Sequence, residues 1–163
     1  MTHAARPKLA LLAVAALVSS SCLYRPVPIP PPMASVQGLT DCAPTDQCPA
    51  DGVIVDFEGF AVPGALVLIE NTTRTLPSGG SYAVSTFARR SETEAGVSDA
   101  SVGDGGVLSR GSFYARLGPI RDVAGGTVTI SQRGDSFIIR QLIPDSQGNY
   151  AVSDWVTLRV PPR

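Results

Sequence analysis

Apolar and polar residues alternate with a period of two along much of the chain after residue 52. Such a period places every second side chain on the same face of a strand, so it predicts half-buried β-strands. A continuous apolar run at 65–69, bounded by Gly64 and Asn71, predicts a strand that is buried on both faces. The predicted strands are 53–57, 65–69, 82–86, 113–117, 128–130, 137–142 and 156–160.

These strands predict the fold class. No segment shows a sustained 3.6-residue apolar period with caps, so helix is expected to be minor. Short strands in this number over residues 52–163 are typical of two packed sheets. We therefore predict an all-β protein with a single Greek-key-type β-sandwich of about seven short strands, and Val67 and Ile69 in its core. The polar segment 91–106 is predicted to be one long exposed loop.

Residues 1–21 have a different pattern. Arg6 and Lys8 precede an apolar run at 9–18, and the small residues Ser19, Ser20 and Ser21 follow it. This order is that of a signal peptide, and the apolar run is too short to cross a bilayer, which needs about 20 residues. The segment therefore predicts export.

The small residues end directly on Cys22, and here the sequence resembles the lipobox of bacterial lipoproteins. The resemblance implies that Cys22 is acylated, becomes the first residue of the mature chain and anchors the protein on a membrane. The position after it is Leu23 rather than aspartate, which implies the outer membrane in a cell that has one. The alternative is an ordinary secretory signal cut after Ser21, with Cys22 left as a free thiol.

Residues 22–51 are predicted to be a stalk that precedes the sandwich. The segment 25–32 contains five prolines, which lack a backbone donor and favour polyproline II. At about 3.1 Å per residue, its eight residues would reach roughly 25 Å as a semi-rigid spacer. A docking site for an aromatic-lined groove is the alternative.

Cys42 and Cys48 follow in the same segment. In an oxidising compartment such a pair normally forms a disulfide, and we predict one here, closing a small loop. A metal site would need four ligands, and the third cysteine lies at the predicted anchor. We expect no metal ion and no cofactor.

Composition limits the chemistry of the mature chain. The only histidine and the only lysine of the full sequence, His3 and Lys8, lie in the predicted signal peptide. Loss of that peptide leaves a mature chain with 11 basic and 14 acidic residues. Without these residue types, Ser-His, Cys-His and Ser-Lys nucleophile systems and the phosphate-binding lysine loop are excluded. The chain is therefore predicted not to be an enzyme, and its mildly acidic charge argues against nucleic acid as a partner.

The segment 52–69 resembles the opening of the carboxypeptidase regulatory-like family, a relative of immunoglobulin-like sandwiches. Ala61 departs from the pattern, which has proline there. The matching residues are Gly52, Ile54, Asp56, Gly59, Val62, Gly64, Ala65, Val67 and Ile69. The resemblance implies a sandwich that serves as an accessory module on envelope proteins, and it implies no activity. Gly59 and Gly64 are expected to permit a tight connection between two antiparallel strands.

Two kinds of binding site remain possible. Calcium could bind acidic loops, but the acids do not follow the Asp-x-Asp-x-Asp-Gly spacing that wraps one ion, and solvated acids are the simpler interpretation. Exposed aromatics could stack on carbohydrate, although Trp155, beside Val156 on the last strand, is expected to face the core. The acidic candidates for calcium are Asp51, Asp56, Glu58, Asp99 and Asp104, and the aromatic candidates are Tyr114, Tyr150 and Trp155. Glu92 and Glu94, with Asp99 and Asp104, are the candidates for carboxylate catalysis, which would need two acids placed across a cleft.

Together these features predict a lipid-anchored protein of the cell envelope. Its partners are expected to be the membrane, through Cys22, and either another envelope protein or a glycan. The expected function is a non-catalytic structural or protein-interaction module, and the alternative is a glycan or cell-wall binding module.

Overall fold

The computed structural model describes residues 28–43, 48–49, 51–90, 110–123 and 126–162. Every regular element in these ranges is a β-strand, and none of the described residues forms a helix that is long and apolar enough to cross a membrane. The strands are β1 (Met33–Asp41), β2 (Gly52–Ala61), β3 (Leu66–Thr75), β4 (Ser81–Phe87), β5 (Arg89–Arg90), β6 (Gly111–Leu117), β7 (Ile120–Arg121), β8 (Val128–Thr129), β9 (Ser131–Gln132), β10 (Ser136–Pro144), β11 (Tyr150–Val152) and β12 (Val156–Arg159).

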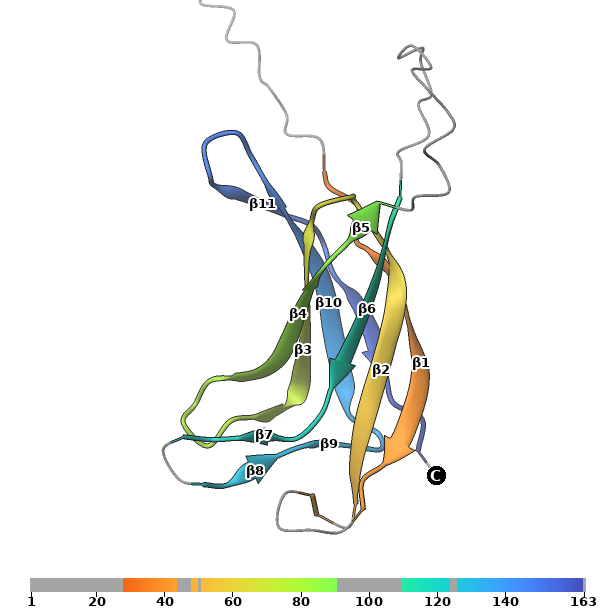
Figure 1. Ribbon diagram of the computed structural model, residues 1–163, viewed down its shortest axis with the longest axis vertical. Coiled ribbons are helices and arrows are strands. Elements are labelled where there is room, and N and C mark those ends of the chain that lie inside the picture. Colours follow the sequence, from red (N-terminus) through yellow and green to blue (C-terminus); the bar gives the residue numbers. More distant parts are fainter. Residues whose placement is uncertain (1–27, 44–47, 50, 91–109, 124–125, 163) are drawn as a thin grey trace, which may run out of the picture.

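The strands form two antiparallel sheets that pack as a sandwich (Figure 1). The first sheet has the order β1-β2-β6-β5, and β9 also pairs with β2. The second sheet has the order β11-β10-β3-β4, and β12 also pairs with β10. Strands β7 and β8 pair with each other in a separate ribbon. The predicted all-β sandwich is thus confirmed.

The two ends of the sandwich differ in what they carry (Figure 1). The chain enters at the end that holds residue 28, the β2–β3 turn and the β10–β11 hairpin, which we call the Pro28 end. The β1–β2 connection with Cys42 and Cys48, the ribbon β7–β8 and the C-terminal residues lie at the other end, which we call the disulfide end. Strand β1 runs from the Pro28 end to the disulfide end.

The core lies between the sheets and follows the predicted alternation. On β2 and β6 every second side chain is buried, and Val67 and Ile69 on β3 are fully buried, as predicted. Phe57 of the first sheet meets Phe137 of the second edge to face, with ring centroids 5.0 Å apart. Burial of aromatic and branched side chains from both sheets supplies the main stabilising free energy.

The sandwich begins earlier than predicted. Strand β1 lies inside the segment 22–51 that was expected to be a stalk, and it pairs with β2 from Met33 opposite Phe60 to Asp41 opposite Val53. The alternation of apolar and polar residues in β1 is not evident in the sequence, because the pairing register with β2 shifts between Val36 and Gly38. One extra residue in a strand displaces the apolar positions that follow it onto odd spacing. The expectation that the sheet starts at Gly52 is therefore corrected.

The strand count also differs from the prediction. Seven strands have four or more residues, and five shorter ones join them. The predicted strand 128–130 is two short strands, β8 and β9, with Ile130 between them. Ile130 is buried, and the chain changes partner at this point, from β7 to β2.

Gly64 and Gly59 have different roles. Gly64 has a φ of +81° in the β2–β3 turn, where a left-handed backbone favours glycine. Gly59 lies inside β2, and a Cβ there would stand 1.9 Å from the Met33 carbonyl oxygen. Gly59 thus allows the close approach of β1. The expectation that it belongs to the turn is wrong.

Candidate functional site

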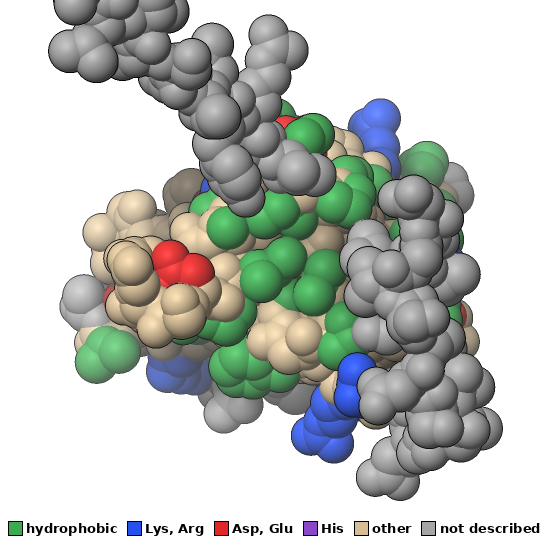
Figure 2. All heavy atoms as spheres, turned by 90° about the horizontal axis from the view of Figure 1, so that it is seen from above, with side chains coloured by type: hydrophobic (Ala, Val, Ile, Leu, Met, Phe, Trp, Pro, Cys, Tyr) green, Lys and Arg blue, Asp and Glu red, His purple; other side chains and the backbone are tan. Residues whose placement is uncertain are grey.

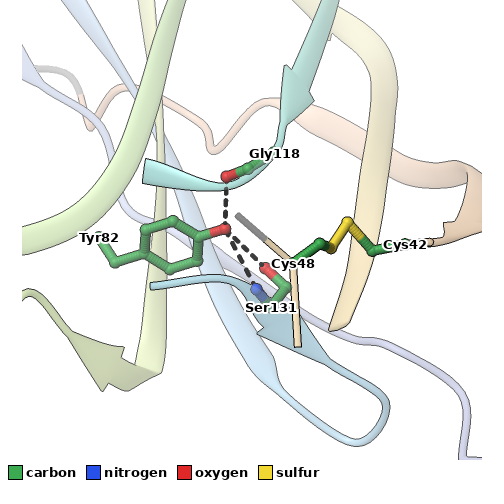
Figure 3. The surroundings of a disulfide bond; sticks show 5 residues. All are labelled: Cys42, Cys48, Tyr82, Gly118 and Ser131. Carbon is green, nitrogen blue, oxygen red and sulfur yellow. Dashed lines mark hydrogen bonds between the residues drawn. A yellow bond between two sulfur atoms is a disulfide. The ribbon is translucent and has the colours of Figure 1, made fainter. Parts of the chain in front are cut away.

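The disulfide closes the end of the sandwich at which β1 turns into β2. Cys42 and Cys48 are joined, as predicted, with their Cα atoms 5.8 Å apart (Figure 3). Cys48 is buried, and the Cys42 amide donates to the Gly52 carbonyl at 2.9 Å, which continues the β1–β2 ladder. The ring therefore holds the end of β1 against the start of β2.

Tyr82 is a polar junction beside the disulfide (Figure 3). Its hydroxyl donates to the Gly118 carbonyl at 2.8 Å and accepts from the Ser131 amide at 3.1 Å. The ring comes from β4, Gly118 lies just before β7, and Ser131 is the first residue of β9. Burial raises the pKa of the Tyr82 phenol above its usual value of 10.0. The hydroxyl therefore stays neutral and serves as a structural link between the two sheets.

A second polar cluster joins β3 to the β9–β10 turn. The buried Asp135 carboxylate accepts from Asn71 Nδ2 at 2.9 Å, from Arg74 Nε at 2.7 Å and from the Gln132 amide at 2.9 Å. Its partner Arg74 is 30% exposed and borders an open hollow. All three donors bind the same oxygen, Oδ2, so the cluster stabilises the turn.

Gln141 fastens the incoming chain to the Pro28 end. Its side chain is 2% exposed, its Nε2 donates to the Pro30 carbonyl at 2.8 Å, and its Oε1 accepts from the Val62 amide at 2.8 Å. Pro32 is buried as well. Residues 30–32 thus belong to the sandwich, so the predicted spacer over 25–32 is shortened at its C-terminal end.

Several predicted site residues lie outside the described part of the chain. Cys22 is one, and the loop acids Glu92, Glu94, Asp99 and Asp104 in the predicted loop 91–106 are the others. The structure therefore says nothing about the predicted anchor or about calcium at that loop.

The other acidic candidates lie on β2 or just before it. Asp56 and Glu58 lie on β2, and Asp51 lies just before that strand at the disulfide end. Asp56 accepts from the Tyr114 hydroxyl at 2.6 Å and pairs with Arg116 at 3.3 Å. In the ranges that the structure describes, no three histidine, cysteine or acidic side chains are grouped as metal ligands.

The three candidate aromatics are all exposed but do not form one platform. Tyr114 is on β6 in the first sheet and Tyr150 is on β11 in the second, whereas Trp155 lies outside the strands, just before β12. The expectation that Trp155 faces the core is wrong, since it is 61% exposed. It lies between β11 and β12, where Ser153 is buried instead and donates its amide to the Gln141 carbonyl.

Sequence reasoning did not single out Gln141 or Asp135. A signal for Gln141 was present, because it occupies the inward position of the period-two run that contains Phe137 and Ile139. A polar residue at a buried strand position requires a hydrogen-bond partner. Asp135 follows Gly134 in a turn, which gives no sign that its carboxylate is buried.

Comparison of the chain with known protein families, with curated proteins and with solved structures finds no match.

Proposed function

We propose that this protein is exported, anchored to the cell envelope by acylation of Cys22, and acts there as a non-catalytic structural or protein-interaction module. The observation that carries the proposal is the disulfide between Cys42 and Cys48. It suits an oxidising compartment, and it leaves Cys22 as the one remaining cysteine of the chain, directly after the apolar run and small residues.

The polar clusters support a structural role. The hydroxyl of Tyr82, the carboxylate of Asp135 and the amide of Gln141 each bind backbone or side-chain groups of the sandwich itself. Each is occupied in holding strands together, and the mature chain would contain no histidine or lysine to activate a nucleophile. The resemblance of 52–69 to carboxypeptidase regulatory-like modules agrees with an accessory role at the envelope.

The anchor is tested by fractionation and mass spectrometry. The native protein should sediment with membranes and carry acyl mass on the peptide that begins at Cys22, whereas Cys22→Ser should lack that mass. A Cys42→Ser, Cys48→Ser double variant is the matched control, because it removes two cysteines and should remain acylated. A mature N-terminal peptide with unmodified Cys22 would refute the anchor.

A carbohydrate-binding function is the second candidate, and the exposure of Trp155 favours it. An exposed indole can stack on a sugar ring with little loss of conformational entropy. Trp155→Ala should then abolish cosedimentation with purified cell-wall glycan, and Tyr114→Ala, on the other sheet, serves as the control. Unchanged cosedimentation of the Trp155 variant would eliminate this candidate site.

A further inference from the structure

Large apolar side chains are exposed at the Pro28 end on the outer faces of both sheets. Met33 and Phe60 face each other across β1 and β2, with 56% and 48% of their surface exposed. On the other sheet, four paired apolar residues form a row across the strands. The row runs Val152, Leu142, Leu66 and Phe87, with Val152 and Phe87 at its two ends. Figure 2, seen from this end, shows apolar side chains gathered across it. Single exposed apolar residues are common, but a gathering at one end indicates a contact surface.

Three arginines border the same end. Arg89 lies opposite Ser112, which in turn lies opposite Phe60, so this arginine shares a row with the apolar pair. Arg90 and Arg110 are its neighbours on β5 and just before β6, and all three are exposed. None of the three forms an ion pair with another described residue. The surface is therefore both apolar and cationic.

The predicted anchor lies close to this surface along the chain. Only five residues separate Cys22 from Pro28, and residues 30–32 are fastened to the sandwich through Gln141. Six residue steps extend at most roughly 20 Å at the polyproline spacing. A lipid on Cys22 therefore holds the Pro28 end near the bilayer, within reach of the phosphate headgroups.

We propose that the Pro28 end is a lipid-contacting surface that rests on the membrane carrying the anchor, an inference that depends on the proposed acylation of Cys22. The apolar side chains enter the interface, and the three arginines bind the phosphates of anionic lipids, as in other proteins that lie on membranes. The disulfide end then faces away from the bilayer. The short proline segment sets this orientation and does not lift the domain clear of the membrane.

The test uses the full-length protein, purified from membranes and reconstituted into vesicles with brominated acyl chains, which quench tryptophan on contact. Trp155→Phe removes the only native tryptophan. In that background Phe60→Trp places a reporter at the Pro28 end, and Val123→Trp places a control reporter at the disulfide end, where Val123 is fully exposed. Vesicles of phosphatidylcholine alone are compared with vesicles that also contain phosphatidylglycerol.

We expect the reporter at position 60 to lose most of its fluorescence and the reporter at position 123 to keep it. Quenching should be stronger with phosphatidylglycerol and should weaken as salt is raised. The docking constant is the ratio of protein whose Pro28 end touches the bilayer to protein whose Pro28 end does not. Each arginine is expected to raise this ratio roughly fivefold on anionic vesicles, so combined glutamine substitution at Arg89, Arg90 and Arg110 should lower it roughly a hundredfold. Arg121→Gln, at the disulfide end, should leave the quenching unchanged.

The outcomes separate the two proposals. If the protein floats with vesicles but position 60 is quenched no more than position 123, the contact surface is refuted and the anchor stands. If the protein does not float with vesicles, the anchor is refuted and the surface assignment falls with it. Quenching that is unaffected by the three arginine substitutions overturns the ionic part of the proposal. Circular dichroism of each variant confirms that it is folded.

Discussion

Replacement of Tyr82 by phenylalanine isolates the contribution of one buried hydroxyl. The change removes a single oxygen atom and keeps the ring in the core. The Ser131 amide, which donates to that oxygen at 3.1 Å, loses this acceptor at a position that is fully buried. The Gly118 carbonyl loses its donor at 2.8 Å but is only half-buried, so water can replace it. The loss of stability should therefore come mainly from the hydrogen bond of the Ser131 amide.

The magnitude follows from the loss of that buried hydrogen bond. Removing one partner of a buried polar group costs about 1–3 kcal/mol, and the Ser131 amide loses the Tyr82 hydroxyl. For a domain of this size each kcal/mol shifts the melting temperature by about 4 °C. We therefore expect Tyr82→Phe to melt roughly 8 °C below the native protein.

The matched control is Tyr114→Phe, which removes a hydroxyl of the same kind from the surface. Tyr114 is 55% exposed and donates to Asp56 at 2.6 Å, where water can take its place. Its loss should change the free energy of unfolding by less than about 0.5 kcal/mol. Thermal melts and urea titrations of both variants measure the difference. Equal stability of the two variants would show that the Tyr82 hydroxyl does not link the sheets.

Alkaline pH provides a second readout. Burial raises the pKa of Tyr82, so the fold favours the neutral phenol. This contribution is fully present below pH 10, the usual pKa, and declines as the pH rises toward the raised value, because the unfolded chain ionises first. The stability gap between the native protein and Tyr82→Phe should narrow above pH 10. The comparison is made in a Tyr114→Phe background, since hydrogen bonding to Asp56 also raises the pKa of Tyr114.

Three further predictions concern other parts of the sandwich. Gly59→Ala brings a Cβ against the Met33 carbonyl and should lower the free energy of unfolding by about 1–3 kcal/mol in urea titrations; an unchanged midpoint would contradict the close approach of β1. Gln141→Leu removes the acceptor of the Val62 amide and should lower the free energy of unfolding by about 1–3 kcal/mol in the same assay. An unchanged free energy of unfolding would refute the role of Gln141 in holding the incoming chain. The pKa of Asp145 is lowered because backbone amides of its hairpin donate to its carboxylate. The hairpin should therefore lose its order only as the pH falls through that lowered pKa. An NMR titration of the Asp145 carboxylate with a midpoint at or above 3.8 would contradict this prediction.

The period-two pattern predicted the core strands because their inward positions are uniformly apolar. Strands β2, β3, β6 and β10 all follow it over their central residues. Strand β1 was missed because its bulge near Gly38 shifts the apolar positions, and because the prolines before it indicated a spacer. Periodicity reports only those strands whose register is continuous.

The candidate surface could not be predicted, because it is assembled from distant parts of the chain. Arg90 and Arg110 are separated by nineteen residues in the sequence and become neighbours only because β5 pairs with the start of β6. Phe60 and Met33 meet in the same way across β1 and β2. The cysteine pair, in contrast, was predictable, since its two members lie six residues apart.

The path of β1 determines how the protein responds to mechanical force. A pull on residue 28 away from the sandwich acts along the length of β1, because this strand runs from that end to the other beside the antiparallel β2. The ladder hydrogen bonds lie perpendicular to the strands, so such a pull loads them together in shear and does not open them one after another. The bond between Gln141 and Pro30 bears the load first, and the disulfide at the far end of β1 excludes only residues 43–47 from the length that can be drawn out. On the proposed anchor at Cys22, a domain held in this way would resist tension between the membrane and a partner at its opposite end.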